Sequence, residues 1–127
     1  MSNINISDKN TGDQLTAAEF NTVKNFINSP EASLGTLNPA SMTFEETGYY
    51  SAYTQTAAIT FTISGTPTGG VCQVFKFTSD GANTISFDTN FEASAIYGVT
   101  PGNTLDAGDY WIYMLCINDK IHVNVKT

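Results

Sequence analysis

The 127-residue sequence has few charged residues, a single histidine and only two cysteines. A zinc site needs several His or Cys ligands at short spacing, and Cys72, Cys116 and His122 do not supply four. Serine or cysteine catalysis would have to use His122, yet no nucleophile-elbow pattern is present. We therefore expect no catalytic residues, no cofactor and no bound metal, and predict that the protein is not an enzyme.

Long apolar runs and an excess of positive charge are also missing. No segment approaches the run of about 18 apolar residues that a membrane-spanning helix needs, and the first residues do not resemble a secretory signal. We therefore expect a soluble protein with no membrane insertion. Twelve Asp and Glu against five Lys and Arg give a formal charge of −7, which repels phosphate backbones. The sequence thus predicts no nucleic-acid partner.

Thr, Ser, Asn and Gly are plentiful, and 12% of the residues are aromatic, which favours a β-rich domain with short turns. Residues 56–64 alternate in polarity as a strand does, and Val71–Thr78 is expected to form a hairpin with Thr84–Asp88 through the loop 79–83. Five to seven short strands after one helix predict an antiparallel β-sandwich or jelly-roll-like domain over residues 49–127.

The C-terminal segment, residues 109–125, predicts a hairpin whose first arm is apolar on both faces. This arm is Tyr110–Ile117, followed by a turn at Asn118–Lys120 and a second arm that alternates, with Ile121, Val123 and Val125 on one face. Because the first arm has no polar face, we expect another element to cover it, either a partner subunit or a helix of the same chain. Trp111 and Tyr113 are the candidate contact residues.

The N-terminal region is expected to contain an arm over residues 1–14 and a capped helix over residues 15–28. Thr16 and Glu19 match the capping box, in which each side chain satisfies a backbone N–H group at the other residue. Leu15, Phe20, Val23 and Ile27 would form the apolar face of the helix, while Ile4 and Ile6 are the apolar residues of the arm. Residues 29–48 are expected to be a linker with a short strand at 41–44.

Two alternatives concern calcium, which loop carboxylates can bind. Residues 8–13 with Glu19 partly match an EF-hand loop, but the glycine stands one position early and the capping box explains Glu19. Asp80, Asp88 and Asp106 occupy predicted turns, where aspartate is common for conformational reasons. We predict no metal site from either group.

Cys72 and Cys116 fall within predicted strands and are expected to be buried small hydrophobic residues. A disulfide would require the two strands to be neighbours.

Tyr49, Tyr50 and Tyr53 lie among Ser, Thr and Gln. An exposed aromatic ring with polar neighbours is a typical surface for stacking on a sugar. These three residues are the candidate sugar-binding residues. The other interpretation is that they pack in the sheet or at a subunit contact.

Two segments resemble fibre and other virion proteins of bacteriophages, particularly those of Bacteroidota such as the crAss-like group. Gly12–Asn21, which reads G-D-Q-L-T-A-A-E-F-N, looks like the start of a helix in many fibre-type proteins. Val74–Val125 is similar to a β module with an apolar strand, an F-T-S-D-G turn, a T-I-S-F strand and a final hairpin. The resemblance covers about half of the chain.

The resemblance implies a structural protein of the virion, made in the cytoplasm of the bacterial host, that forms a homo-oligomer, most simply a trimer. The sequence lacks the heptads of a long fibre, which favours a head fibre, a capsid decoration protein or a small tail component over a tail fibre that binds a receptor. Other virion proteins would be its partners, bound through the arm and helix. The alternative function is a carbohydrate-binding module for host-surface polysaccharide.

Overall fold

A computed structural model describes residues 32–127, and these residues are mainly β, as the sequence predicts. The expected arm and helix, with Ile4, Ile6, Leu15, Phe20, Val23 and Ile27, lie outside the described residues. The strands are β1 (Gly48–Tyr49), β2 (Tyr53–Thr54), β3 (Ile59–Phe61), β4 (Cys72–Ser79), β5 (Ile85–Phe87), β6 (Phe91–Tyr97), β7 (Gly108–Ile117) and β8 (Lys120–Lys126).

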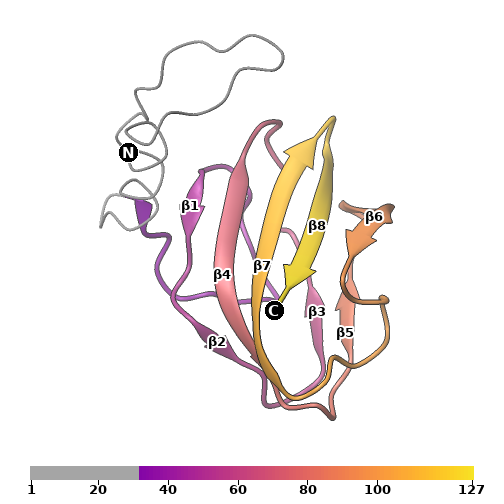
Figure 1. Cartoon of the computed structure of the whole chain (residues 1–127). Helices are drawn as coiled ribbons and strands as arrows, with labels where there is room; N and C mark the ends of the chain where they lie inside the picture. The colour runs from indigo at the N-terminus through magenta and orange to yellow at the C-terminus, as the bar shows by residue number, and fades with distance from the viewer. Residues whose placement is uncertain (1–31) are drawn as a thin grey trace, which may run out of the picture. The chain divides into compact units, whose positions relative to one another are not determined.

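The strands form one six-stranded sheet and one two-stranded sheet (Figure 1). The larger sheet has the order β1-β4-β7-β8-β6, with β2 also paired to β4, and β3 pairs with β5 in the smaller sheet. Strand β7 pairs antiparallel with β4 and with β8. The other pairs are parallel: β1 and β2 with β4, β3 with β5, and β6 with β8. The prediction of an antiparallel domain was therefore wrong, and the sheets are mixed.

The predicted hairpin between β4 and β5 does not form, because β5 crosses to the second sheet. After β4, Asp80 accepts hydrogen bonds from the backbone N–H groups of Ala82 and Asn83, both at 2.9 Å. The side chain of Gln55 then donates to the backbone carbonyls of Asn83 and Thr84. These contacts hold the chain in a turn that leaves β4 free to pair with β7.

The core joins the two sheets through aromatic rings. Phe61 of β3 lies with its ring centroid 5.9 Å from that of Phe75 and 6.5 Å from that of Phe77, both on β4. Residues expected to form a linker also enter this core: Leu37, Met42 and Phe44 are buried. The compact unit that contains the sheets spans Leu34–Thr127. In place of the predicted strand at 41–44 there is one bridge, between Met42 and Ile63.

The predicted C-terminal hairpin is confirmed as β7 and β8, with a turn of two residues rather than three. Asn118 and Asp119 have φ angles of 49° and 68°, the left-handed pair that a tight hairpin turn requires. Lys120 already belongs to β8. The predicted inward face of that strand is also confirmed, because Ile121, Val123 and Val125 are buried.

The two cysteines lie on neighbouring strands but on opposite faces of the sheet. Cys72 of β4 stands opposite Leu115 on β7, whereas Cys116, one residue further along, points into the core and is 1% exposed. Successive side chains of a strand point to opposite faces, so the two sulfur atoms cannot meet, and both cysteines are free.

The chain after β6 must pass very close to β8, and we expect glycine to be required there. A Cβ atom on Gly98 would lie 2.1 Å from the carbonyl oxygen of Val125, whereas one on Gly102 would meet nothing within 4 Å. Both glycines have positive φ, at 89° and 85°. Gly98→Ala should lower the free energy of unfolding by about 2–4 kcal/mol, and Gly102→Ala by only about 1 kcal/mol. Urea unfolding of both variants measures the difference, and equal losses would contradict the close contact.

Candidate functional site

The central strand β7 has one buried face and one exposed apolar face. Its inward residues Ile112, Met114 and Cys116 are at most 1% exposed. The alternate residues are 40–47% exposed, and we call them the apolar stripe: Trp111, Tyr113, Leu115 and Ile117. Large exposed apolar groups in one continuous line are uncommon on soluble monomers and mark an interaction surface. This stripe is the first candidate site.

Polar and basic side chains border the stripe. The β8 residues opposite its four members are Lys126, Asn124, His122 and Lys120. On the other side, Lys76 of β4 stands opposite Trp111. The three lysines of residues 32–127 therefore all lie on this face, although the described part of the chain is acidic. The stripe thus has a lysine-rich border, in which Lys76 is paired with Asp109 at 3.3 Å.

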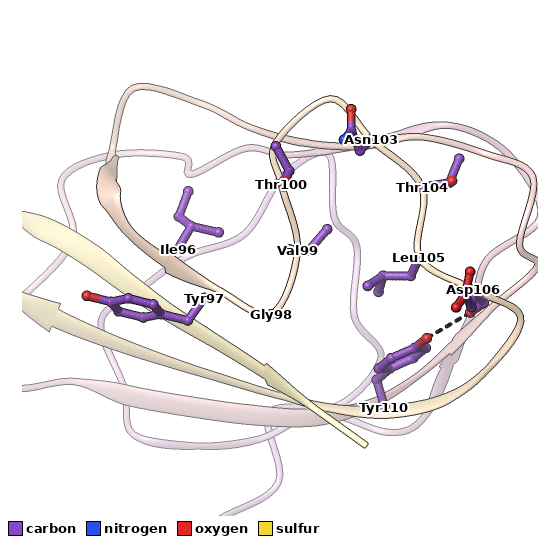
Figure 2. Close-up of a pocket in the computed structure, with 10 residues that line it drawn as sticks. All are labelled: Ile96, Tyr97, Gly98, Val99, Thr100, Asn103, Thr104, Leu105, Asp106 and Tyr110. Atoms are coloured by element: carbon purple, nitrogen blue, oxygen red, sulfur yellow. Dashed lines mark hydrogen bonds between the residues drawn. The ribbon is translucent and has the colours of Figure 1, made fainter.

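Figure 2 shows a second candidate site, an open pocket of about 570 Å³ between the end of the six-stranded sheet and the loop after β6. In Figure 2 the side chains of Val99 and Leu105 lie within the curve of this loop and Tyr110 lies below it, with Tyr97 at one end and Asp106 at the other. Tyr97 is 60% exposed, while Leu105 is buried. The remaining lining residues are Ile96, Gly98, Thr100, Asn103 and Thr104. This site combines the ring of Tyr110 with hydroxyl, amide and carboxyl groups, whereas the ring of Tyr97 points away from the loop in Figure 2.

Trp111 and Tyr113, expected from the sequence to make subunit contacts, lie together on the apolar stripe. The stripe also contains Leu115 and Ile117, which the sequence analysis did not single out. The period-2 spacing of the four residues would have identified them, because alternate positions of one strand share a face.

The three tyrosines expected to bind sugar do not form one exposed cluster. Tyr49 pairs with Val74 and Tyr53 with Phe77, so the edge strand has one residue more than β4 between these pairs. The extra residue turns Tyr50 and Tyr53 toward the core, where their rings contact Phe75 and Phe77. Burial raises the pKa of the Tyr50 hydroxyl, and a hydrogen bond to Gln73 partly offsets this.

Two of the three aspartates considered for calcium have side chains that bond to the backbone. Asp80 closes its own turn, and Asp88 accepts the backbone N–H groups of Ile63 and Asn90, both at 2.8 Å. Within residues 32–127, no group of three or more His, Cys, Asp or Glu side chains is placed to hold a metal ion. The EF-hand-like segment that ends at Glu19 lies outside the described residues.

No protein-family model, curated protein or solved structure matches the chain. In the part of the chain that the structure describes, no helix has the length and apolar character needed to cross a bilayer.

Asp109, at the border of the stripe, should titrate at low pH. A 2.6 Å hydrogen bond from Thr78 and the ammonium group of Lys76, 3.3 Å away, lower the pKa of its carboxyl group below 3.8. Because the folded pKa is depressed, these contacts stabilise the fold above pH 3.8 and lose their effect as the pH falls through the folded pKa. In Thr78→Val, an NMR titration of the carboxyl carbons should show the Asp109 pKa rising toward 3.8. The pKa of Asp80, lowered within its own turn, should stay unchanged as the control.

Proposed function

We propose that this chain is a non-enzymatic structural protein of a bacteriophage virion, a head fibre, decoration protein or small tail component that forms a homo-oligomer, built on a β-sandwich-like domain. The apolar stripe supports this proposal most directly. Four neighbouring side chains on one strand, including a tryptophan, leave large apolar areas in contact with water. Covering them with another copy of the chain would gain free energy in proportion to the apolar area removed from water.

The lysine-rich border disfavours one kind of two-fold dimer and is compatible with a cyclic trimer. In a two-fold dimer whose axis runs across the strands, β8 of one copy lies over β8 of the other, which would bring Lys120, His122 and Lys126 of the two copies together. In a cyclic trimer each contact joins two different surfaces. The lysines of one copy would then face the acidic remainder of the next copy. Opposite charges across such a contact also select the correct orientation.

Attachment to the particle is assigned to the N-terminal region on the basis of its sequence pattern. Ile4 and Ile6 in the arm and the apolar residues Leu15, Phe20, Val23 and Ile27 would bind a neighbouring virion protein. The β domain and the attachment segment would then have separate tasks, with the domain forming the oligomer.

The stripe can be tested by placing a lysine in its centre. Leu115→Lys should convert a trimer, with three times the 13.7 kDa mass of the chain, into a monomer, because a charge buried in an apolar contact is costly. Light scattering on a sizing column, at two protein concentrations about 100-fold apart, measures the mass.

Thr60→Lys is the matched control, since Thr60 is exposed on β3 of the other sheet. It should leave the trimer intact. A wild-type chain that is monomeric at both concentrations, or a Leu115→Lys trimer, would refute the stripe as the subunit contact.

The attachment segment can be tested separately. Phe20→Asp should prevent incorporation into phage particles by placing a charge on the apolar face of the expected helix. Asn21→Asp adds the same charge at the next position, outside the set of apolar contact residues, and should be incorporated normally. Quantitative mass spectrometry of purified particles gives the readout, and equal incorporation of the two variants would argue against attachment through the helix.

A carbohydrate-binding module is the second candidate function, with Tyr49, Tyr50 and Tyr53 as the residues predicted for it from the sequence. Tyr50 and Tyr53 are half-buried, and one side of each ring packs on the core. The ring of Tyr97 is 60% exposed and lies opposite Asn124 on the outer face of the six-stranded sheet, so it offers more surface to a ligand.

A further inference from the structure

Aromatic side chains form a row across the strands on the outer face of the six-stranded sheet. Tyr97 of β6 pairs with Asn124 of β8, and Asn124 pairs with Tyr113 of β7. Tyr113 pairs in turn with Val74 of β4, and Val74 pairs with Tyr49 of β1. Residues paired in this way point to the same face of a sheet, and in Figure 2 the Tyr97 ring points away from the loop over the pocket. The row therefore crosses the apolar stripe at Tyr113.

Two rings of this row are open to solvent, with a polar residue between them. Tyr97 is 60% exposed and Tyr113 is 44% exposed. Asn124 lies between them on β8, so two strand spacings, about 10 Å, separate the two tyrosines. In an extended, equatorially linked polysaccharide, alternate pyranose rings are a similar distance apart. Each tyrosine can thus pack on the C–H face of one ring, while the Asn124 amide bonds to hydroxyl groups of the ring between them.

The charge of this face favours an acidic polysaccharide over a neutral one. The lysines of residues 32–127 are Lys76, Lys120 and Lys126, and all of them lie on the outer face, although the described part of the chain is acidic. Lys126 is exposed and stands two residues from Asn124 on the same face of β8, about 7 Å along the strand. Lys76 is paired with Asp109 at 3.3 Å. Lys126 is therefore the cation best placed to bind a carboxylate on the sugar ring between the two tyrosines.

Other partners match this row less well. A single-stranded nucleic acid also combines rings with negative charge, but it carries one phosphate per nucleotide, which the lysines of a chain with a formal charge of −7 do not balance. A second copy of the chain that follows the stripe along β7 would leave Tyr97 uncovered, because β8 lies between β7 and β6. An extended glycan that lies across the strands contacts Tyr113 and Tyr97 together.

We propose that an extended acidic polysaccharide built from uronate rings binds along this row, packing on Tyr97 and Tyr113 with a carboxylate beside Lys126. This inference rests on the carbohydrate-binding alternative and gives that function a ligand class and a face of the sheet. Of the tyrosines predicted to bind sugar, Tyr49 stands in the row. A glycan on the row and a neighbouring subunit on the stripe would both cover Tyr113, so they are alternative occupants of this face. Tyr97 distinguishes them, because it lies outside the stripe.

The test is a titration of the ¹⁵N-labelled full chain with a hexasaccharide of D-mannuronate and, separately, with cellohexaose, which has the same extended linkage without carboxylates. The mannuronate hexasaccharide should shift amide signals of β6, β7 and β8 with saturation at millimolar concentration or below. Its affinity should fall as NaCl is raised from about 20 to about 200 mM, because salt screens the attraction between Lys126 and the carboxylates. Cellohexaose should bind about twofold to fivefold more weakly.

Variants at two positions of the outer face test the residues. Tyr97→Ala should weaken binding of the mannuronate hexasaccharide about fivefold to tenfold, because the stacking surface is lost, whereas Tyr97→Phe keeps the ring and should bind as the wild type does. Lys126→Gln should weaken binding about twofold to fivefold. Lys120→Gln is the matched control for charge, since Lys120 is exposed on the same strand but about 14 Å from Asn124. It should leave the affinity unchanged.

The inference would be overturned by the absence of a saturable shift with the mannuronate hexasaccharide, or by equal affinity in the wild type and Tyr97→Ala. Tighter binding of cellohexaose, or of a thymidylate hexamer, would also overturn it. The assembly proposal is decided separately, by the mass of the wild-type chain and of Leu115→Lys. Tyr97→Ala should leave that mass unchanged, so loss of glycan binding and loss of assembly are distinguishable.

Discussion

The structure depends on the position of β7, a ten-residue strand hydrogen-bonded on both edges, to β4 and to β8. A strand in this central position must turn its side chains alternately to two faces. In most sheets with one solvent-exposed face, the residues that point to solvent are polar. In β7 both the inward and the outward residues are apolar. The inner set completes the phenylalanine-rich core, and the outer set forms the apolar stripe. The same strand therefore stabilises the domain and presents the exposed apolar stripe.

Buried glutamines explain how irregular segments can contribute to such a core. Each buried backbone carbonyl needs a hydrogen-bond donor, which a segment outside the sheet does not find in a ladder. Gln73 donates to the carbonyls of Thr43 and Glu46, both at 3.0 Å, and Gln55 does the same for Asn83 and Thr84. The hydrogen bonds of these side chains take the place of the backbone hydrogen bonds that a paired strand would provide. They allow the segment that carries Met42 and Phe44 to be buried without forming a strand.

Local patterns predicted the strands better than their partners. The C-terminal hairpin was predicted because its alternation and its Asn-Asp turn are contiguous in sequence. By contrast, the parallel partner of β5 is β3, and nothing between residues 61 and 85 signals that crossover. The register change next to Tyr50 was missed for a related reason: it is defined only by pairing with β4. Of the candidate site, Trp111 and Tyr113 were predicted, whereas the pocket depends on the contact between Gly98 and Val125, which is remote in sequence.

The alternation of β7 also separates folding from association. Replacing an outer residue such as Leu115 leaves Met114 and Cys116, its neighbours along the chain, packed in the core on the opposite face. The outer surface can therefore change without unfolding the domain, provided that the backbone pairing with β4 and β8 is kept. The pocket has no such freedom, because Leu105 is buried and Tyr110 packs against the core while both line its floor. The shape of the pocket is thus tied to the stability of the domain, so a substitution at Leu105 would change both together.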